Sequence, residues 1–269
     1  MNPIRSFSFA SVWAVALRHL RLWRKDLNFI LSGFYWPLLD IVIWGFLGSW
    51  IAQSQIPEFH NYKEAALLGI LLWQIVGRGC NIIGFAFCEE LWSNNIVNLF
   101  SLPLRTTEWM LGIIVFYGIM MSITTLFCML VISLLYDLSL IHIFSVFLFF
   151  LPPLFISGIW IGFTCLQIVT ILGKRGVELG FVVGWFLLPF CGAYYPVEVL
   201  PNWAQKVSAF LPMTYVFQGM RGYVMHEQDP TSYLIKGYAL SILYAIFALT
   251  MFVYCFNRSK QKGLARLAD

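Results

Sequence analysis

Long apolar stretches separated by short polar segments dominate the chain. Most are as long as the roughly 20 residues that a helix needs to cross about 30 Å of hydrocarbon. The predicted spans are residues 29–51, 65–87, 109–135, 143–170, 179–193 and 233–257. The pattern therefore predicts an all-α membrane protein with six transmembrane helices, of which the fifth is too short to cross unaided.

Composition agrees with this prediction. Hydrophobic residues make up 60% of the chain, charged residues 11%, and the mean hydropathy is +0.78. Soluble domains have about 45–50% apolar and about 25% charged residues. The N-terminal segment lacks the pattern of a cleavable signal peptide, so the first span is expected to target the chain to the membrane.

Basic residues predict the orientation, because Lys and Arg are retained on the cytoplasmic side. They precede the first span, separate spans four and five, and follow the last span, so both termini are expected in the cytoplasm. The net charge of +4 then reflects topology and attraction to anionic lipids, and nucleic-acid binding is not expected. The residues on the cytoplasmic side are Arg5, Arg18, Arg21, Arg24, Lys25, Lys174, Arg175, Arg258, Lys260, Lys262 and Arg266.

The segment before the first span has the pattern of an amphipathic helix in the cytoplasmic headgroup layer. Trp13, Leu17 and Leu20 recur at three- and four-residue steps beside a basic stripe. A merely basic tail is the alternative. The expected membrane anchors are Trp13, Arg18, Arg21 and Lys25.

A second short helix is predicted between spans two and three, within residues 89–109. Ile96, Leu99 and Phe100 form an apolar face at helical spacing, and Pro103 ends the helix. Thr106 is expected to cap the third span, with Glu108 in its first turn. This helix either connects two spans along the membrane or inserts into a partner protein on the cytoplasmic side.

Two charged residues fall inside predicted spans, where charges are rare. Asp40 lies about 17 Å into the first span from the cytoplasm, and Arg78 about 20 Å into the second from outside, at 1.5 Å per residue. Their depths are similar, so the sequence predicts an Asp40–Arg78 ion pair between adjacent spans. The alternative is that both line a substrate path.

Three prolines, Pro196, Pro201 and Pro212, divide the segment between spans five and six into two short helical pieces of about 15 Å each. Broken backbone enters a membrane only where protein or a water-filled cavity covers it. We therefore predict a re-entrant hairpin that caps the outer end of a pathway. An amphipathic hairpin lying on the outer headgroups is the alternative.

No motif for nucleotide, metal or covalent chemistry is present. The P-loop, H-E-x-x-H and G-x-S-x-G patterns are absent, and the six cysteines lack paired spacing, so no catalytic residue, disulfide or metal site is expected. Three histidines on the predicted outer side, His60, His142 and His226, could contact a metal or haem, although isolated histidines at span ends are usually solvated.

The quoted segments resemble the ABC-2 type permeases, the membrane subunits of type 2 ABC exporters. The most specific match is PVEVLPNWAQKVSAFLPMTYVFQGMRG; RHLRLWRKDLNF followed by Pro37, and EELWSNNIVNLFSLPLRTTEW, support it. The last segment is less basic than the corresponding loop of many family members. The resemblance covers residues 1–269 as one transmembrane domain, with an N-terminal helix in 1–28, a six-span bundle in 29–257 and a basic tail in 258–269.

The resemblance implies a homodimer that binds two copies of a separate cytoplasmic ABC ATPase, which holds ATP and Mg²⁺. No cofactor is expected on this chain. The residues implied in coupling to the ATPase are Glu89, Glu90, Leu91, Trp92, Ile96, Leu99 and Phe100. The residues implied in an outer gate are Tyr195, Trp203, Phe210, Tyr215 and Phe217.

The function expected from this resemblance is ATP-driven export of an amphiphilic drug or lipid across the bacterial inner membrane. Export of a lipid-linked polysaccharide is the closest alternative, since aromatic side chains also stack on sugars. Alternatives of another class are a polytopic membrane enzyme, a haem-handling protein and a passive scaffold. Replacing His60, His142 and His226 together with alanine would separate the haem alternative from export.

Overall fold

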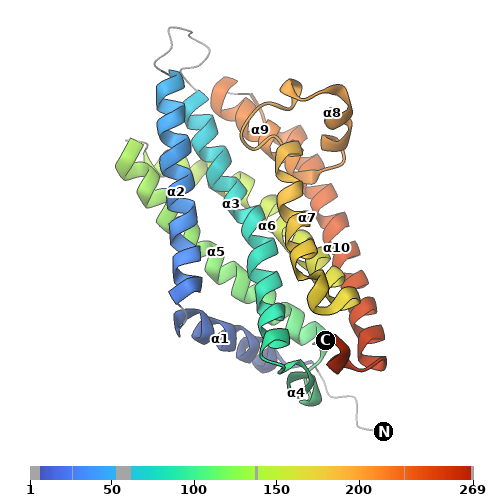
Figure 1. Cartoon of the computed structure of the whole chain (residues 1–269). Coiled ribbons are helices and arrows are strands. Elements are labelled where there is room, and N and C mark those ends of the chain that lie inside the picture. Colours follow the sequence, from blue (N-terminus) through green and yellow to red (C-terminus); the bar gives the residue numbers. More distant parts are fainter. Residues whose placement is uncertain (1–6, 26, 53–61, 137–138, 227, 268–269) are drawn as a thin grey trace.

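The computed structural model describes residues 7–25, 27–52, 62–136, 139–226 and 228–267, and all regular structure in these residues is helical. The prediction of an all-α protein is therefore confirmed. The α-helices are α1 Phe9–Lys25, α2 Leu27–Ala52, α3 Tyr62–Trp92, α4 Ile96–Ser101, α5 Thr106–Tyr136, α6 Leu140–Leu172, α7 Val177–Phe186, α8 Asn202–Ser208, α9 Pro212–His226 and α10 Thr231–Gln261 (Figure 1). The 3₁₀ turns are η2 Gly173–Gly176, η3 Leu188–Phe190, η4 Val197–Val199 and η5 Leu264–Leu267.

Four stretches of the described chain are long and apolar enough to cross a membrane: Glu64–Trp92, Thr106–Tyr136, Phe144–Phe190 and Thr231–Gln261. Predicted spans two, three and six lie within α3, α5 and α10. Predicted spans four and five merge, because only η2 separates α6 from α7. α2 coincides with the predicted first span, and the six-span topology stays a prediction.

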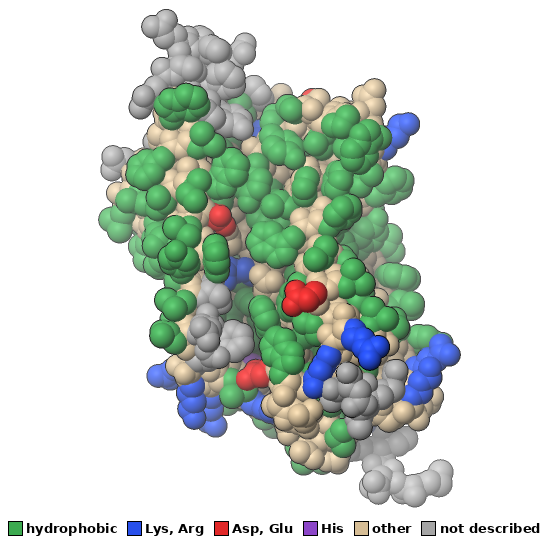
Figure 2. Space-filling model, viewed as in Figure 1, with side chains coloured by type: hydrophobic (Ala, Val, Ile, Leu, Met, Phe, Trp, Pro, Cys, Tyr) green, Lys and Arg blue, Asp and Glu red, His purple; other side chains and the backbone are tan. Residues whose placement is uncertain are grey.

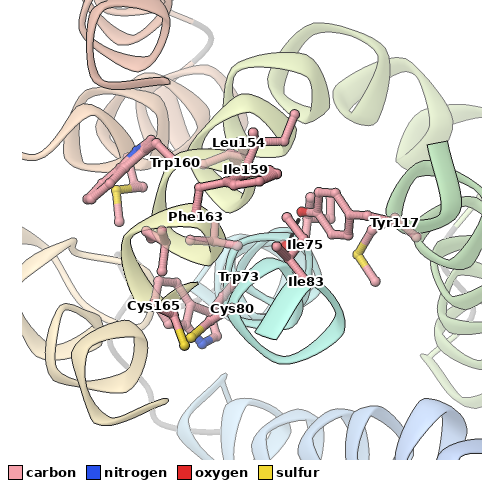
Figure 3. Packing of buried hydrophobic residues seen from close by; sticks show 14 of the residues in the cluster. Trp73, Ile75, Cys80, Ile83, Tyr117, Leu154, Ile159, Trp160, Phe163 and Cys165 are labelled. Atoms are coloured by element: carbon pink, nitrogen blue, oxygen red, sulfur yellow. Dashed lines mark hydrogen bonds between the residues drawn. The ribbon is translucent and has the colours of Figure 1, made fainter. Parts of the chain in front are cut away.

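α3 is the central helix of the bundle. In its most apolar part 83% of residues are buried, compared with 28% in α10. It packs against α6 where Gly79 faces Gly158, and the Tyr117 O–H of α5 donates to the Ile75 carbonyl of α3 at 2.7 Å (Figure 3). Small residues let helices approach closely in membranes, where packing rather than water exclusion drives their association.

The two ends of the bundle differ. α1, α4 and η5 lie at one end, and α8 and α9 lie at the other (Figure 1). Lys and Arg gather near the α1 end, while hydrophobic side chains cover the middle of the visible face (Figure 2). Side chains such as Leu134 and Ile141 are 81% and 83% exposed, a surface suited to lipid rather than water.

α1 has an apolar face that the sequence analysis did not identify. Val12, Val15, Ala16 and His19 are buried, and α1 packs on α5, with Val15 against Gly112. By contrast, Trp13, predicted as a membrane anchor, is 49% exposed. α1 therefore joins the bundle on one side and leaves Trp13 on the surface.

The segment between α7 and α10 is helical in two pieces, as predicted, but the pieces differ in length. α8 has 7 residues and α9 has 15, or about 10 Å and about 22 Å at 1.5 Å per residue, rather than about 15 Å each. The predicted lengths were wrong because α8 already ends at Ser208, and Pro212, expected to end the first piece, is the first residue of α9. Met213, Val216, Phe217 and Met220 of α9 are buried in the core.

Candidate functional site

A groove of about 730 Å³ runs beside α3 and is bounded by residues of α1, α2, α5 and α7. We call it the α3 groove. The α3 residues that line it recur every three or four positions, so they lie on one face of the helix. They extend over about 28 Å, at 1.5 Å per residue, and include Trp73, Gln74, Gly77, Arg78, Asn81, Phe85, Glu89 and Trp92.

The opposite walls of the α3 groove are largely aromatic. α2 contributes Trp36 and Asp40, and α7 contributes Glu178, Phe181 and Trp185. Local sequence explains the placement, because Trp36 and Asp40 are four residues apart and Phe181 and Trp185 are also four apart, which puts each pair on one helix face. The groove therefore combines a mainly apolar surface with a few polar groups, as small-molecule sites do.

Asp40 and Arg78, predicted from the sequence as an ion pair or as pathway residues, both line the α3 groove. The hydrogen-bond partner of Asp40 is Gln74, whose Nε2 donates to Oδ2 at 2.6 Å. Gln74 lies one helical turn before Arg78, and sequence reasoning missed it although the spacing of four could have indicated it. The Asp40–Arg78 ion pair stays a prediction.

The α3 groove ends at the turn after α7. Tyr194 lines the groove and stacks on Trp44 of α2, with ring centroids 4.8 Å apart. The turn is held by Arg221 of α9, whose Nη2 donates to the carbonyls of Gly192 at 3.0 Å and Ala193 at 3.4 Å. Arg221 is the arginine of the P-x-T-Y segment, so this motif holds the turn that places Tyr194 in the groove lining.

The five residues predicted as an outer gate have different surroundings. Trp203 and Phe210 are 63% and 70% exposed, whereas Phe217 is fully buried in the core. The hydroxyls of Tyr195 and Tyr215 donate to the carbonyls of Pro189 and Ala209, respectively. A gate formed by these five side chains stays a prediction; in the structure Tyr194, which the sequence analysis did not select, lies at the groove.

At the other end of the bundle an ion pair joins α1 to α3. Arg18 Nη2 lies 2.8 Å and 2.9 Å from the two carboxylate oxygens of Glu90, and Asn95 Nδ2 donates to the same carboxylate at 2.8 Å. The Glu90 side chain is 1% exposed. We call Arg18, Glu90 and Asn95 the α1–α3 clamp; it ties the N-terminal helix to the turn that begins α4.

The seven residues predicted to couple to an ATPase therefore have different surroundings. Glu90, Leu91, Ile96 and Leu99 are buried within the chain, and Glu89 is partly exposed beside His19, with Oε2 3.9 Å from Nδ1. Phe100 packs on Phe256 and lies under the Lys260 ammonium, 4.5 Å from the ring centroid. The exposed apolar side chains in α4 and the segments directly beside it include Trp92, Val97 and Leu102.

Glu108 joins the starts of two helices. Its carboxylate accepts hydrogen bonds from the backbone N–H groups of Ser8 at 2.8 Å and Arg105 at 3.0 Å. Ser8 precedes α1 and Arg105 precedes α5, so one buried acid satisfies a donor at each helix start, where carboxylates are favoured. Glu108 lies in the first turn of α5, as predicted, whereas Thr106 is the first helical residue rather than the cap.

Within the described residues, no group of three or more His, Cys, Asp or Glu side chains could hold a metal ion. The six cysteines are free, and five of them are buried. Among the histidines considered for haem, His60 lies outside the described residues, as do the side chains of His142 and His226.

The helical bundle with an aromatic-lined groove and mainly apolar surface is that of a membrane protein. A family model described as ABC-2 family transporter protein matches residues 52–254. The chain belongs to this family, and the resemblance noted from its sequence is confirmed. Comparison with curated proteins finds no match.

Proposed function

We propose that this chain is the permease subunit of an ATP-driven exporter that moves an amphiphilic substrate outward across the bacterial cytoplasmic membrane. α2, α3, α5, α6, α7 and α10 span the membrane, and α1, α4 and η5 lie on the cytoplasmic side. The α3 groove is the observation that carries this proposal. It extends along α3 from Trp92, near the α1 end, to Trp73, and Tyr194 forms part of its lining.

The energy for export comes from a partner ABC ATPase, the subunit that family membership implies. ATP and Mg²⁺ bind to that partner, and this chain acts as a homodimer with two ATPase copies. Exposed Trp92, Val97 and Leu102 provide an apolar surface around α4 for docking, because large apolar side chains gathered at one exposed site favour protein contact.

The α1–α3 clamp supports a route from α4 to the α3 groove. Asn95 directly precedes α4, and its side chain binds the same Glu90 carboxylate as Arg18 of α1. His19, the neighbour of Arg18, lines the groove. A displacement of α4 by the ATPase would therefore move α1 and the groove wall together.

The aromatic walls also support a second candidate, export of a lipid-linked glycan, because sugar rings stack on exposed Trp and Tyr. Its substrate would need more room than one chain encloses. Comparing a fluorescent short-chain phospholipid with a fluorescent lipid-linked oligosaccharide in the same vesicles separates the two candidates.

The test uses inside-out membrane vesicles that contain the permease and its co-purified ATPase. Adding ATP should drive accumulation of the fluorescent phospholipid, and vanadate should stop it. Val97→Asp on α4 should reduce both ATPase recovery and accumulation, because a charge replaces an exposed apolar contact. The matched control, Gln261→Asp at the end of α10, should leave both unchanged. Absence of an ATPase from the purified permease would overturn the proposal.

A further inference from the structure

The charged side chains that line the α3 groove are mostly acidic. Glu89 and Glu178 lie toward its cytoplasmic end, and Asp40 lies farther along it, beside Gln74. Among the described residues that line the groove, Arg78 is the only Lys or Arg. Three carboxylates against one guanidinium leave a formal excess of two negative charges along the groove.

His19 adds no positive charge to this lining at neutral pH. It is 3% exposed, and burial, with a smaller contribution from Arg18, lowers its pKa to about 4. His19 therefore does not offset the formal excess of negative charge along the groove near pH 7.

Tryptophan is the second feature of the lining. Five of the chain's 11 tryptophans, Trp23, Trp36, Trp73, Trp92 and Trp185, line the α3 groove. The face of an indole ring attracts cations more strongly than that of any other side chain. Acidic groups among indoles favour a ligand that is both cationic and apolar.

At the Asp40 end of the groove, one carboxylate is held in a fixed orientation. Gln74 is 8% exposed and fixes Asp40 through the bond to Oδ2. Trp73 is 1% exposed, and its Nε1 lies against Gly77 without a hydrogen-bond partner among the described residues. This N–H is itself buried, so Trp73 contributes its ring to the wall of the groove rather than a donor to the ligand.

We propose that the α3 groove binds amphiphilic organic cations, with the positive charge near Asp40 and the apolar body between the indole rings. This inference rests on the proposed function, since it names the substrate class of the same permease. The groove volume of about 730 Å³ lies within the roughly 300–1,000 Å³ of small-molecule sites. An anion of the same shape would meet an excess of carboxylates and is disfavoured.

Equilibrium binding to the purified permease, without ATPase or ATP, tests the proposal. Tetraphenylphosphonium and tetraphenylborate are suitable probes, because they have the same shape and opposite charge. The permease should bind tetraphenylphosphonium saturably and at least about tenfold more tightly than tetraphenylborate, as expected for loss of one ionic contact in a partly wet site.

Single substitutions assign the effect to the groove. Asp40→Asn should weaken tetraphenylphosphonium binding about tenfold, because an amide keeps the size but not the charge. Glu178→Gln, at an exposed position on the wall, should weaken it severalfold. The matched control is Glu198→Gln, an exposed acid outside the groove, which should change nothing.

Equal binding of the two probes would overturn the proposal. So would unchanged tetraphenylphosphonium binding in both Asp40→Asn and Glu178→Gln; the second variant is at an exposed position, so misfolding at Asp40 does not confuse the result. ATP-driven phospholipid export without tetraphenylphosphonium binding would overturn this inference alone. Tetraphenylphosphonium binding by a permease that recovers no ATPase would overturn the proposed function alone.

Discussion

At the scale of single residues, the crossing of α3 and α6 depends on glycine. A Cβ at Gly79 would collide with the backbone of Gly158, and backbone atoms cannot move aside as a flexible side chain can. Gly79→Ala should therefore push α3 and α6 apart. It should reduce the free energy of unfolding by about 1–3 kcal/mol, as overpacking does in closely packed cores. The thermal unfolding midpoint of the permease in detergent measures this loss.

Gly118→Ala on α5 is the matched control for that experiment. There a Cβ would lie 3.5 Å from the Phe155 ring, an ordinary contact distance, and alanine also favours helix. Its midpoint should equal or exceed that of the unsubstituted protein. If both variants were equally stable, close packing at Gly79 would not be required.

Buried His19 gives the fold a dependence on pH. Its pKa falls from 6.5 to about 4, mainly because burial disfavours the charged imidazolium. Between these two pH values the unfolded chain binds a proton that the folded chain does not. The free energy of unfolding should therefore decrease as the pH falls from about 6.5 to about 4, by up to about 3 kcal/mol.

Unfolding measured at intervals across that pH range tests the role of His19. His19→Gln cannot take up a proton, so its unfolding free energy should change less with pH than that of the unsubstituted protein. Carboxylates also make the unfolding free energy depend on pH, but they do so equally in both proteins. Glu89, 3.9 Å from Nδ1, would reduce the effect by stabilising the charged form. Parallel profiles for the two proteins would contradict the assignment.

At the scale of elements, the α1–α3 clamp connects three helices through one carboxylate. Glu90 is on α3, Arg18 on α1, and Asn95 precedes α4, and each contact is 2.8–2.9 Å long. Removing one of the three side chains leaves a buried polar or charged group without its hydrogen-bond partner. This destabilises the fold by more than the intact contact stabilises it.

Glu90→Gln should lower the free energy of unfolding by about 1–3 kcal/mol. This is less than the loss expected for a fully buried ion pair, because the Arg18 side chain is 38% exposed to solvent. Arg18→Met should cost a similar amount, and the double variant should cost less than the two single losses combined. A double-mutant cycle of unfolding free energies measures this coupling. Strictly additive losses would show that the two side chains act independently.

The sequence predicted most elements, because the length of an apolar stretch indicates a membrane helix; proline position was a poorer guide, since Pro37, Pro152 and Pro153 lie inside α2 and α6. It predicted less well which face of a helix is buried. In α1 the periodic residues Trp13 and Leu17 indicated a lipid face, but Val12 and Val15 form a second apolar face that packs on α5. A helix between protein and lipid is apolar on both sides, so periodicity alone does not distinguish them.

The sequence predicted only part of the candidate site, because a charge in an apolar span is conspicuous and an uncharged residue there is not. Asp40 and Arg78 stood out as charges in apolar spans, and both line the α3 groove. Gln74 and Tyr194 carry no charge and gave no comparable signal. The position of Tyr194 depends on the turn that Arg221 of α9 holds. Arg221 lies 29 positions after Gly192 and 28 positions after Ala193 in the sequence, so local patterns do not reveal these contacts.

At the scale of the whole molecule, the two ends of the bundle have distinct chemistry. The end with α1 and α4 carries most of the Lys and Arg residues and the α1–α3 clamp (Figure 2). The opposite end carries α8, with Trp203 63% exposed. Because basic residues are retained in the cytoplasm, the end with α1 is expected inside and α8 outside.

Cysteine labelling tests this orientation directly. Five native cysteines are buried and Cys255 is partly exposed, so Cys255→Ser gives a background of low reactivity. In that background a membrane-impermeant maleimide should label Trp203→Cys on α8 when the cytoplasmic membrane is intact. It should label Val97→Cys on α4 only after that membrane is opened. A permeant maleimide should label both, and labelling with the two sides reversed would place the ATPase-docking surface outside the cell, where no ATP-driven partner could reach it.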